Sequence, residues 1–235
     1  MAFVLAGHNG SGKSTLWREQ LADTLRIPLI NADRMMLSIL PEPDAQTGRI
    51  PEWARELRDE QVQWQILSQH GVRAFKRLVM EHQMPFAFET VFSHWKPLPG
   101  GGHESKVDDI REMQRAGYFV VLVFVGLTSV DMSILRVLTR TLQGGHAVDT
   151  AKLTHRFART QAAIGHAAPI ADMTLMFDNS RLTSEQAFTL VRAQMRRAVL
   201  FDARDPMYSV PPDLLTACEP WMAAVTGAFA PKTRR

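Results

Sequence analysis

The chain has 235 residues, of which 46% are apolar, and a formal net charge of only +3 at pH 7. This length can bury the core of one α/β domain with an extension, so we expect a single domain over residues 1–235 with a core over 1–180. The few excess cations are scattered, which argues against nucleic-acid binding, and the longest apolar run, Phe119–Val125, is far shorter than the roughly 18 residues of a membrane-spanning helix.

The cysteine content and the first residues indicate the compartment. Cys218 is the single cysteine, so an intrachain disulfide is excluded, and the start of the chain lacks the basic and long apolar segments of a signal peptide. We therefore expect a cytoplasmic protein.

Short apolar and β-branched runs alternate with longer helical patterns along the chain. The predicted strands, in chain order, are Ala2–Ala6, Pro28–Asn31, Phe86–Phe88, Phe119–Val125 and Met173–Phe177. This alternation predicts an α/β fold with a doubly wound, parallel, five-stranded sheet, whose ligands bind at the carboxyl ends of the strands.

The first predicted strand runs into a complete P-loop motif, G-x-x-x-x-G-K-[S/T], followed by a helix and Thr15. In such a loop the backbone N–H groups and the start of the helix bind a polyphosphate. Lys13 is expected to contact the β- and γ-phosphates of ATP, and the Ser14 hydroxyl to bind Mg²⁺. The motif is Gly7, His8, Asn9, Gly10, Ser11, Gly12, Lys13 and Ser14.

The second predicted strand ends in Asn31-Ala32-Asp33-Arg34. A carboxylate there faces the phosphate site, and Asp33 is our candidate for the base that accepts the proton of an attacking hydroxyl. The alternative is that Asp33 only caps a helix beginning at Arg34.

The third predicted strand ends in Phe88-Glu89-Thr90. A half-buried carboxylate is costly unless it is paired, so Glu89 is expected to bond either an acceptor hydroxyl or a Mg²⁺-bound water. A strand that merely emerges into solvent is the alternative.

Two segments between the strands are unusual. Residues 34–84 are too long for an ordinary connection and predict a helical insertion, in which the helical spacing of Trp53, Trp64, Leu67 and Phe75 favours core packing over ligand stacking. Farther along, a second segment has the makings of a lid, with a hinge at Gly144-Gly145 and arginines that can clamp phosphate. Of these arginines, Arg136 and Arg159 are interpreted as solvated surface, and Arg140 and Arg156 remain candidates.

The last part of the chain is predicted to be a helical extension over 181–230. It contains a helical pattern over Glu185–Leu200 and a second segment, Pro211–Phe229, whose Met and aromatic residues are expected to pack against the sheet.

The chain resembles the zeta toxin kinases, and most closely their Gram-negative zeta-like branch. The resemblance extends over residues 3–180 and depends on the order of the following motifs: the P-loop, Asn-Ala-Asp at 31–33, Phe-Glu-Thr at 88–90, Gly117-Tyr118, the segment 143–148, Arg156-Phe157 and Asp178-Asn179-Ser180. The family phosphorylates a UDP-activated amino sugar with ATP and blocks synthesis of cell-wall precursors.

The resemblance implies a role for each matching residue. Lys13 and Ser14 would bind ATP and Mg²⁺, Asp33 would be the catalytic base, and Glu89 and Thr90 would hold the acceptor. Arg140 and Arg156 would contact the phosphates. From the residues themselves, Arg34 or Lys96 is positioned to meet the diphosphate of the acceptor, and an exposed apolar face suits an antitoxin partner.

The sequence departs from the family at two places. His8 stands where this branch usually has proline, which we expect to matter little because the loop acts through its backbone. No glycine separates Glu89 from Thr90, unlike in the better-known zeta toxins, which leaves the acceptor open. A nucleotide switch, an ATP-binding module without turnover, and a kinase of another hydroxylated metabolite remain alternatives.

Overall fold

The computed structural model describes residues 1–142, 145, 148–181 and 187–227. Its main sheet has seven strands in the order β2-β3-β1-β6-β7-β8-β9, and a separate two-stranded hairpin pairs β4 with β5. The strands are β1 Ala2–Gly7, β2 Leu29–Ile30, β3 Phe86–Thr90, β4 Trp95–Pro97, β5 His103–Ser105, β6 Val120–Gly126, β7 Met173–Asp178, β8 Thr189–Met195 and β9 Ala198–Asp202.

All five predicted strands are confirmed, and they pair in parallel in the order β2-β3-β1-β6-β7. The prediction of a five-stranded sheet is wrong, because β8 and β9 extend the same sheet as antiparallel strands. The sheet therefore continues past the boundary expected near residue 180.

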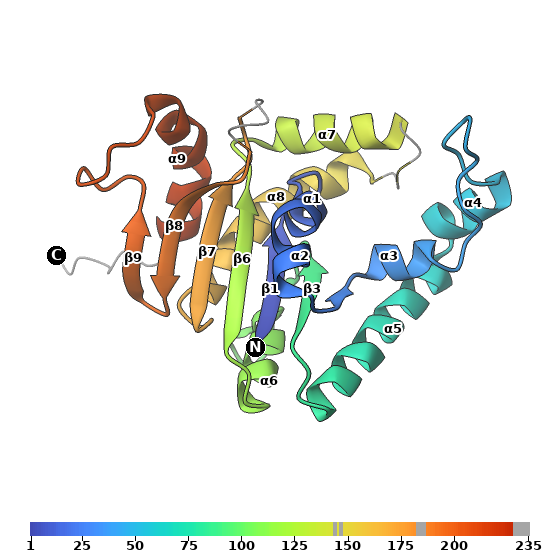
Figure 1. The fold of residues 1–235 in the computed structure, drawn as a ribbon, viewed down its shortest axis with the longest axis horizontal. Coiled ribbons are helices and arrows are strands. Elements are labelled where there is room, and N and C mark those ends of the chain that lie inside the picture. Colours follow the sequence, from blue (N-terminus) through green and yellow to red (C-terminus); the bar gives the residue numbers. More distant parts are fainter. Residues whose placement is uncertain (143–144, 146–147, 182–186, 228–235) are drawn as a thin grey trace.

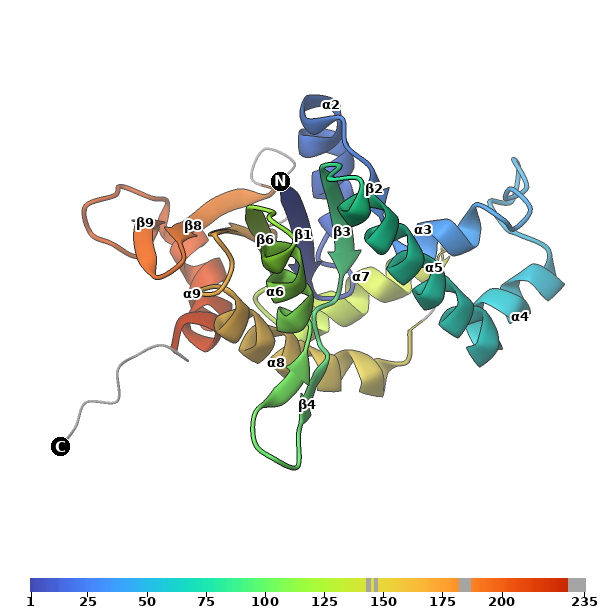
Figure 2. The same ribbon diagram turned by 90° about the horizontal axis from the view of Figure 1, so that it is seen from below.

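The helices connect and cover these strands (Figures 1 and 2). A short π-helical stretch, Trp17–Leu21, joins the first two helices, and α3, α4 and α5 lie between β2 and β3. The helices are α1 Lys13–Leu16, α2 Ala22–Leu25, α3 Ala32–Leu37, α4 Glu52–Glu60, α5 Val62–Glu81, α6 Val107–Arg115, α7 Val130–Leu142, α8 Thr150–Ala167 and α9 Pro212–Thr226.

The main core lies between the sheet and the layer formed by α6, α8 and α9 (Figure 2). The apolar strand β6 is buried along its whole length, as expected for a central strand of a parallel sheet. On the opposite face, Leu16 of α1 packs against Val121 and Val123 of β6. Figure 1 shows no helix over β7, β8 and β9 on that face.

The predicted helical extension over 181–230 is corrected by these strands. Residues 189–195 form β8, although Ala, Gln, Arg and Met in this stretch favour helix, because pairing with both β7 and β9 overrides local propensity. Only α9 is helical among the described residues beyond 181, and Trp221 and Met222 are buried in the main core as predicted for that segment.

The expectation of core packing in the segment between β2 and β3 is also wrong for most of its apolar residues. Trp53, Leu67 and Phe75 are 58%, 59% and 41% exposed, respectively, because α4 and α5 extend away from the sheet. In the part of the chain that the structure describes, no helix is both long and apolar enough to cross a membrane.

Candidate functional site

The phosphate-binding loop lies at the carboxyl end of β1, in the middle of the sheet, where β1 is paired with β3 and β6. Its glycines fit the space available. A Cβ on Gly7 would lie 2.6 Å from the carbonyl oxygen of Val125, and Gly12 has a φ of +91° with the Asn179 amide 2.6 Å from the position of a Cβ. Neither position admits a side chain without a backbone shift.

Two side chains from neighbouring elements fix the loop. Asn179, just after β7, donates to the carbonyl oxygen of Ser11 at 2.8 Å, and Ser133 of α7 donates to that of Asn9 at 2.7 Å. These two contacts anchor the loop to α7 and to the end of β7. Sequence reasoning missed Ser133. It named Asn179 in the Asp178-Asn179-Ser180 motif but gave it no role, although its place at the end of a strand was a usable signal.

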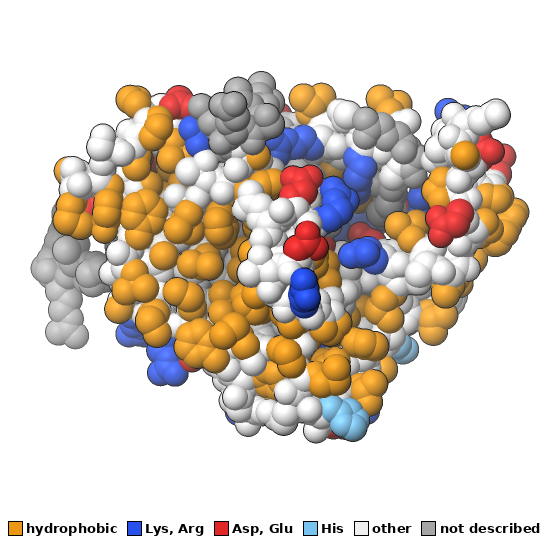
Figure 3. Space-filling model, in the orientation of Figure 1, with side chains coloured by type: hydrophobic (Ala, Val, Ile, Leu, Met, Phe, Trp, Pro, Cys, Tyr) orange, Lys and Arg blue, Asp and Glu red, His pale blue; other side chains and the backbone are white. Residues whose placement is uncertain are grey.

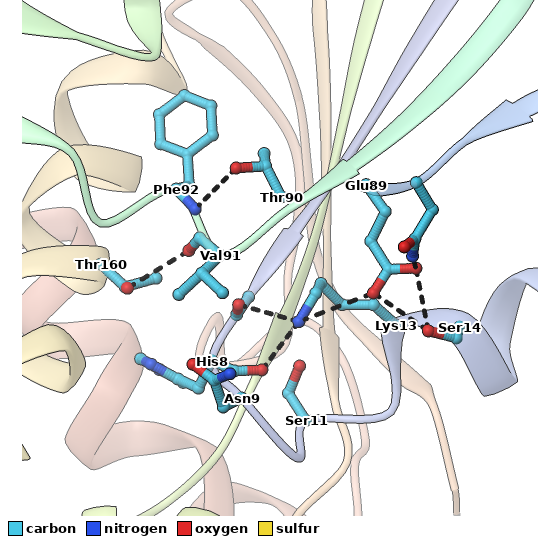
Figure 4. Close-up of polar contacts among 12 residues, drawn as sticks. His8, Asn9, Ser11, Lys13, Ser14, Glu89, Thr90, Val91, Phe92 and Thr160 are labelled. Carbon is cyan, nitrogen blue, oxygen red and sulfur yellow. Dashed lines mark hydrogen bonds and ion pairs between the residues drawn. The ribbon is translucent and has the colours of Figure 1, made fainter. Parts of the chain in front are cut away.

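Lys13 lies in the centre of the loop and is 7% exposed. Its Nζ donates to the carbonyl oxygens of Gly7 at 3.0 Å and His8 at 2.8 Å, and it lies 4.0 Å from Oε1 of Glu89 (Figure 4). Burial lowers the pKa of Lys13, and Arg140 acts in the same direction, whereas the carboxylates of Glu89 and Asp33 oppose it.

Glu89, at the end of β3, connects the loop to the start of α3. Its carboxylate accepts hydrogen bonds from Ser14 Oγ at 2.9 and 3.0 Å and from Asn31 Nδ2 at 2.7 Å. The Glu89 side chain is 12% exposed, so a paired carboxylate here meets the expectation for a half-buried acid. One of its two partners is Ser14, the residue whose hydroxyl is expected to bind Mg²⁺.

Asn31 excludes one of the two interpretations of Asp33, the helix cap. Helix α3 begins at Ala32, and the Asn31 side chain caps it by accepting from the N–H of Arg34 at 3.0 Å. The proposal that Asp33 caps a helix starting at Arg34 is therefore wrong. Asp33 is exposed in the first turn of α3 and makes no hydrogen bond or ion pair with any described residue.

The remaining predicted site residues lie on β3, α3, α7 and α8. Thr90 is half-buried and accepts from the N–H of Phe92 at 3.2 Å, and Arg34 is exposed on α3. Arg140 is exposed in the last turn of α7, and Arg156 is half-buried on α8. The predicted hinge residue Gly144 lies outside the described residues, as do Gln143, His146 and Ala147.

Two arginines interpreted as solvated surface have defined surroundings instead. Arg136 of α7 lies against the loop, with its Cβ 3.1 Å from the position of a Cβ on Gly10, and burial lowers its pKa although Asp178 opposes this. Arg159 of α8 donates to the carbonyl oxygen of Trp95 at 3.1 Å and so attaches the β4-β5 hairpin to α8. Figure 3 shows basic side chains around a hollow below α7 and beside α3.

His8 has a well-defined environment, contrary to the expectation that its side chain matters little. The ring is 1% exposed, stacks on Phe157 of α8 with 3.9 Å between centroids, and meets the edge of Phe124. Burial, with Lys13 nearby, lowers the pKa of His8 to about 3, so the ring is neutral at physiological pH.

Comparison by sequence and comparison by structure gave different results for this protein. No family model matches the sequence, and no curated protein matches it. Solved structures do match. The complex AvrRxo1-ORF1:-ORF2 with ATP has a TM-score of 0.60 and 14% identity, with 100% of this chain and 66% of that chain covered. The same complex with sulphate ions has a TM-score of 0.60 and 13% identity over 97% of this chain and 75% of that chain.

A second system has the same fold. The structure from the PezAT chromosomal toxin-antitoxin system of Streptococcus pneumoniae has a TM-score of 0.55 and 12% identity, covering 98% of this chain and 88% of that chain. The chain thus spans 66% of the length of the ATP complex and most of the PezAT structure. Identities this low establish the fold alone, and at that level the resemblance seen in the sequence is confirmed: the chain has the same fold as the AvrRxo1 complexes and the PezAT structure.

Proposed function

We propose that this protein is an ATP-dependent kinase that phosphorylates a hydroxyl group of a small molecule. The observation that carries the proposal is the arrangement around Glu89, which brings Ser14 and Lys13 of the P-loop together with Asn31 at the carboxyl ends of adjacent strands. One carboxylate beside a phosphate-binding loop suits Mg²⁺, and a second one, Asp33, suits transfer to an acceptor because it is available to take the proton of the attacking hydroxyl.

The loop and its arginines supply binding and charge stabilisation. The N–H groups of the loop hold the β-phosphate, and Lys13 contacts the β- and γ-oxygens. Arg140 and Arg156 approach from α7 and α8, where charge builds up on the γ-phosphoryl group as it transfers. The neighbour with 14% identity was crystallised with ATP, which supports the choice of nucleotide.

The oxygen atoms beside the loop fit Mg²⁺. Ser14 Oγ and the Glu89 carboxylate lie 2.9 Å apart, and Mg²⁺ takes one or two such groups together with phosphates and water. Among the described residues there is no group of three or more His, Cys, Asp or Glu side chains that would hold a metal alone, so the ion would enter with ATP. Mg²⁺, when bound, supplies charge neutralisation between the β- and γ-phosphates. We propose that Glu89 would bind a Mg²⁺-bound water beside Ser14, and that Thr90 binds the acceptor.

Asp33 is the proposed catalytic base. It lies at the start of α3, close enough to Lys13 to affect its pKa, and its carboxylate makes no hydrogen bond with described residues, so it is available to an acceptor hydroxyl. As the hydroxyl oxygen attacks phosphorus, its proton passes to Asp33, the bond to the bridging oxygen breaks, and ADP leaves.

We further propose a UDP-linked N-acetyl amino sugar as the acceptor and an antitoxin as a protein partner. Thr90 bonds a sugar hydroxyl, and Arg34 or Lys96 meets the diphosphate. The antitoxin is supported by the PezAT structure, which comes from a toxin-antitoxin system.

The acceptor is tested by mass spectrometry of UDP-N-acetylglucosamine after incubation with protein, ATP and Mg²⁺. A product heavier by one phosphate, absent with Lys13→Ala, is expected. An enzyme that phosphorylates another metabolite in a panel but never the UDP-sugar would overturn this acceptor and leave the kinase in place. A diphosphate-bearing acceptor is also expected to bind more weakly when Arg34 or Lys96 is neutralised and when salt is raised.

A further inference from the structure

His8 and Arg156 line one small pocket between the P-loop and α8, together with Asn9 and Ser133. The pocket is closed on the α8 side by Phe157, the residue next to Arg156 in the chain. His8 of the P-loop therefore faces α8, the helix that carries the proposed phosphate-binding residue Arg156.

The contact between His8 and Phe157 is specific in geometry. The two rings stack with an interplanar angle of 16° and a centroid distance of 3.9 Å, which is the parallel arrangement of an aromatic pair. Figure 4 shows the His8 ring pointing toward α8, away from Lys13. Since the ring is 1% exposed, any rotation or shift of α8 about this point changes a buried contact.

Polar groups in this pocket lack partners. Both ring nitrogens of His8 and Oδ1 of Asn9 are buried without a hydrogen bond among the described residues. Arg156, on the opposite wall, makes no hydrogen bond or ion pair with any described residue. A buried acceptor without a donor is costly, and a guanidinium has donors to spare, so the pocket holds complementary groups that this arrangement leaves unpaired.

We propose that His8 is a positioning residue for Arg156. The stacked contact with Phe157 fixes this part of α8 against the phosphate loop, and a ring nitrogen of His8, unpaired in this structure, accepts a hydrogen bond from Arg156 when ATP is bound. The proposal rests on the proposed function, because it takes Arg156 to be a ligand of the γ-phosphate. It assigns the His8 side chain a role that the backbone of the P-loop does not supply.

The test measures nucleotide preference by direct binding and so needs no acceptor. Arg156→Ala is expected to reduce the affinity for ATP relative to ADP by about tenfold, the scale of one hydrogen bond to a charged group. His8→Ala is expected to give a similar loss. His8→Phe, which keeps the stack and removes the nitrogens, is expected to fall between His8→Ala and the parent.

The decisive measurement is the double variant His8→Ala/Arg156→Ala. If His8 acts through Arg156, the double variant loses no more ATP-over-ADP preference than Arg156→Ala alone. Losses that multiply, or a His8→Ala protein with the parent's preference, would overturn the inference. His155→Ala, which removes the exposed histidine beside Arg156 on α8, is the control and should leave the preference unchanged.

Thermal unfolding of each variant shows whether it is folded, and His8→Phe serves if His8→Ala is not. If His8→Phe reduces the ATP-over-ADP preference of the parent but has no further effect in the Arg156→Ala protein, the inference is supported. If His8→Phe reduces the preference in both proteins, the inference is contradicted. A parent protein that binds ATP and prefers it to ADP but phosphorylates nothing would refute the kinase while leaving the positioning of Arg156 intact.

Discussion

Glu89 links the P-loop to the start of α3. Its carboxylate accepts from Ser14 and Asn31 and lies 4.0 Å from the ammonium of Lys13. Glu89→Gln keeps the shape of the side chain but replaces one acceptor oxygen by a donor, which disrupts these bonds. We expect the Mg²⁺ concentration for half-maximal phosphoryl transfer to rise roughly 10- to 100-fold, the range for groups that orient metal ligands.

The control for this variant is Glu104→Gln, because Glu104 is exposed on β5 and paired only with His94. Titration of Mg²⁺ at fixed ATP measures the effect. An unchanged Mg²⁺ requirement together with a raised KM for the acceptor would show that Glu89 binds the acceptor instead.

Asp33 can be tested without disturbing α3, since Asn31 is the residue that caps this helix. Asp33→Asn removes the proton acceptor and preserves the shape. We expect ATP affinity to stay within a few fold and single-turnover transfer to slow by about 10²-fold or more, the usual scale for loss of a general base. Asp23→Asn, in the first turn of α2, is the matched control, and a transfer rate equal to that of the parent would exclude the catalytic role.

His8 also predicts a dependence of stability on pH. Its pKa is about 3 in the folded protein, because of burial and the nearby cation of Lys13, and the ordinary pKa of histidine is 6.5. Below pH 6.5 the unfolded chain binds a proton that the folded protein does not, so stability falls as the pH falls toward 3 and is fully present above 6.5.

The measurement is urea unfolding of the parent and His8→Phe between pH 7 and pH 4. Relative to this variant, the parent should lose at most about 1.4 kcal/mol of unfolding free energy per pH unit below pH 6.5. Parallel pH profiles for the two proteins would show that His8 is not held neutral in the folded state.

At the residue scale, the sequence predicts the P-loop in full because its pattern is local and its backbone geometry requires those residue types. It does not predict the environments of His8, Arg136 or Arg159. Their partners, Phe157, Gly10 and Trp95, are distant in the chain, and only the packing of α7 and α8 on the sheet brings them together. Asn31 shows the same limit, since its bond to Glu89 joins residues 58 positions apart.

At the element scale, α9 is attached to the sheet through a buried carboxylate. Asp178 at the end of β7 is 0% exposed and accepts from Trp221 Nε1 at 2.9 Å, Ser180 Oγ at 2.8 Å and the N–H of Ser180 at 3.0 Å. Asn179, the next residue, holds the P-loop. The packing of α9 is therefore linked to the site through three consecutive residues.

Trp221→Phe should destabilise the protein by roughly 1 to 3 kcal/mol, because the buried carboxylate loses one of its donors. Trp221→Ala should cost about 3 to 5 kcal/mol, since it also leaves a cavity against Gly126 and Phe124. Denaturant unfolding measures both, with Trp53→Phe as the control because Trp53 is 58% exposed. A Trp221→Phe protein as stable as the parent would mean that the hydrogen bond contributes nothing.

The elements themselves were predictable to different degrees. The five parallel strands follow from apolar runs whose burial on both faces leaves a clear signal. Strand β8 does not, because Arg192 and Gln194 interrupt its apolar pattern, and its pairing with β7 and β9 stabilises it instead. Arg192 pairs with Asp202 across the two strands, and Gln194 bonds the carbonyl oxygen of Arg196 at the turn.

At the scale of the whole molecule, the charged site and the apolar surface occupy separate parts of one face. Figure 3 shows charged side chains around the hollow below α7 and apolar side chains over β6 to β9. The exposed apolar residues of β8 and β9 include Leu190, Met195 and Val199. An apolar surface of this kind suits contact with a partner protein, and a partner bound there would leave the opening of the phosphate site uncovered.

The central claim is that the γ-phosphate of ATP reaches a hydroxyl group of a small molecule. The most direct test is to incubate the protein with Mg²⁺ and γ-labelled ATP in an extract of cytoplasmic metabolites, and then to follow the label by chromatography and mass spectrometry. We predict that label appears in a phosphorylated small molecule, and that Lys13→Ala abolishes this product while Lys106→Ala, which changes a lysine on the far side of the sheet near α6, does not. Protein that binds ATP but leaves all the label in ATP or in free phosphate, whatever metabolite is present, would contradict the account.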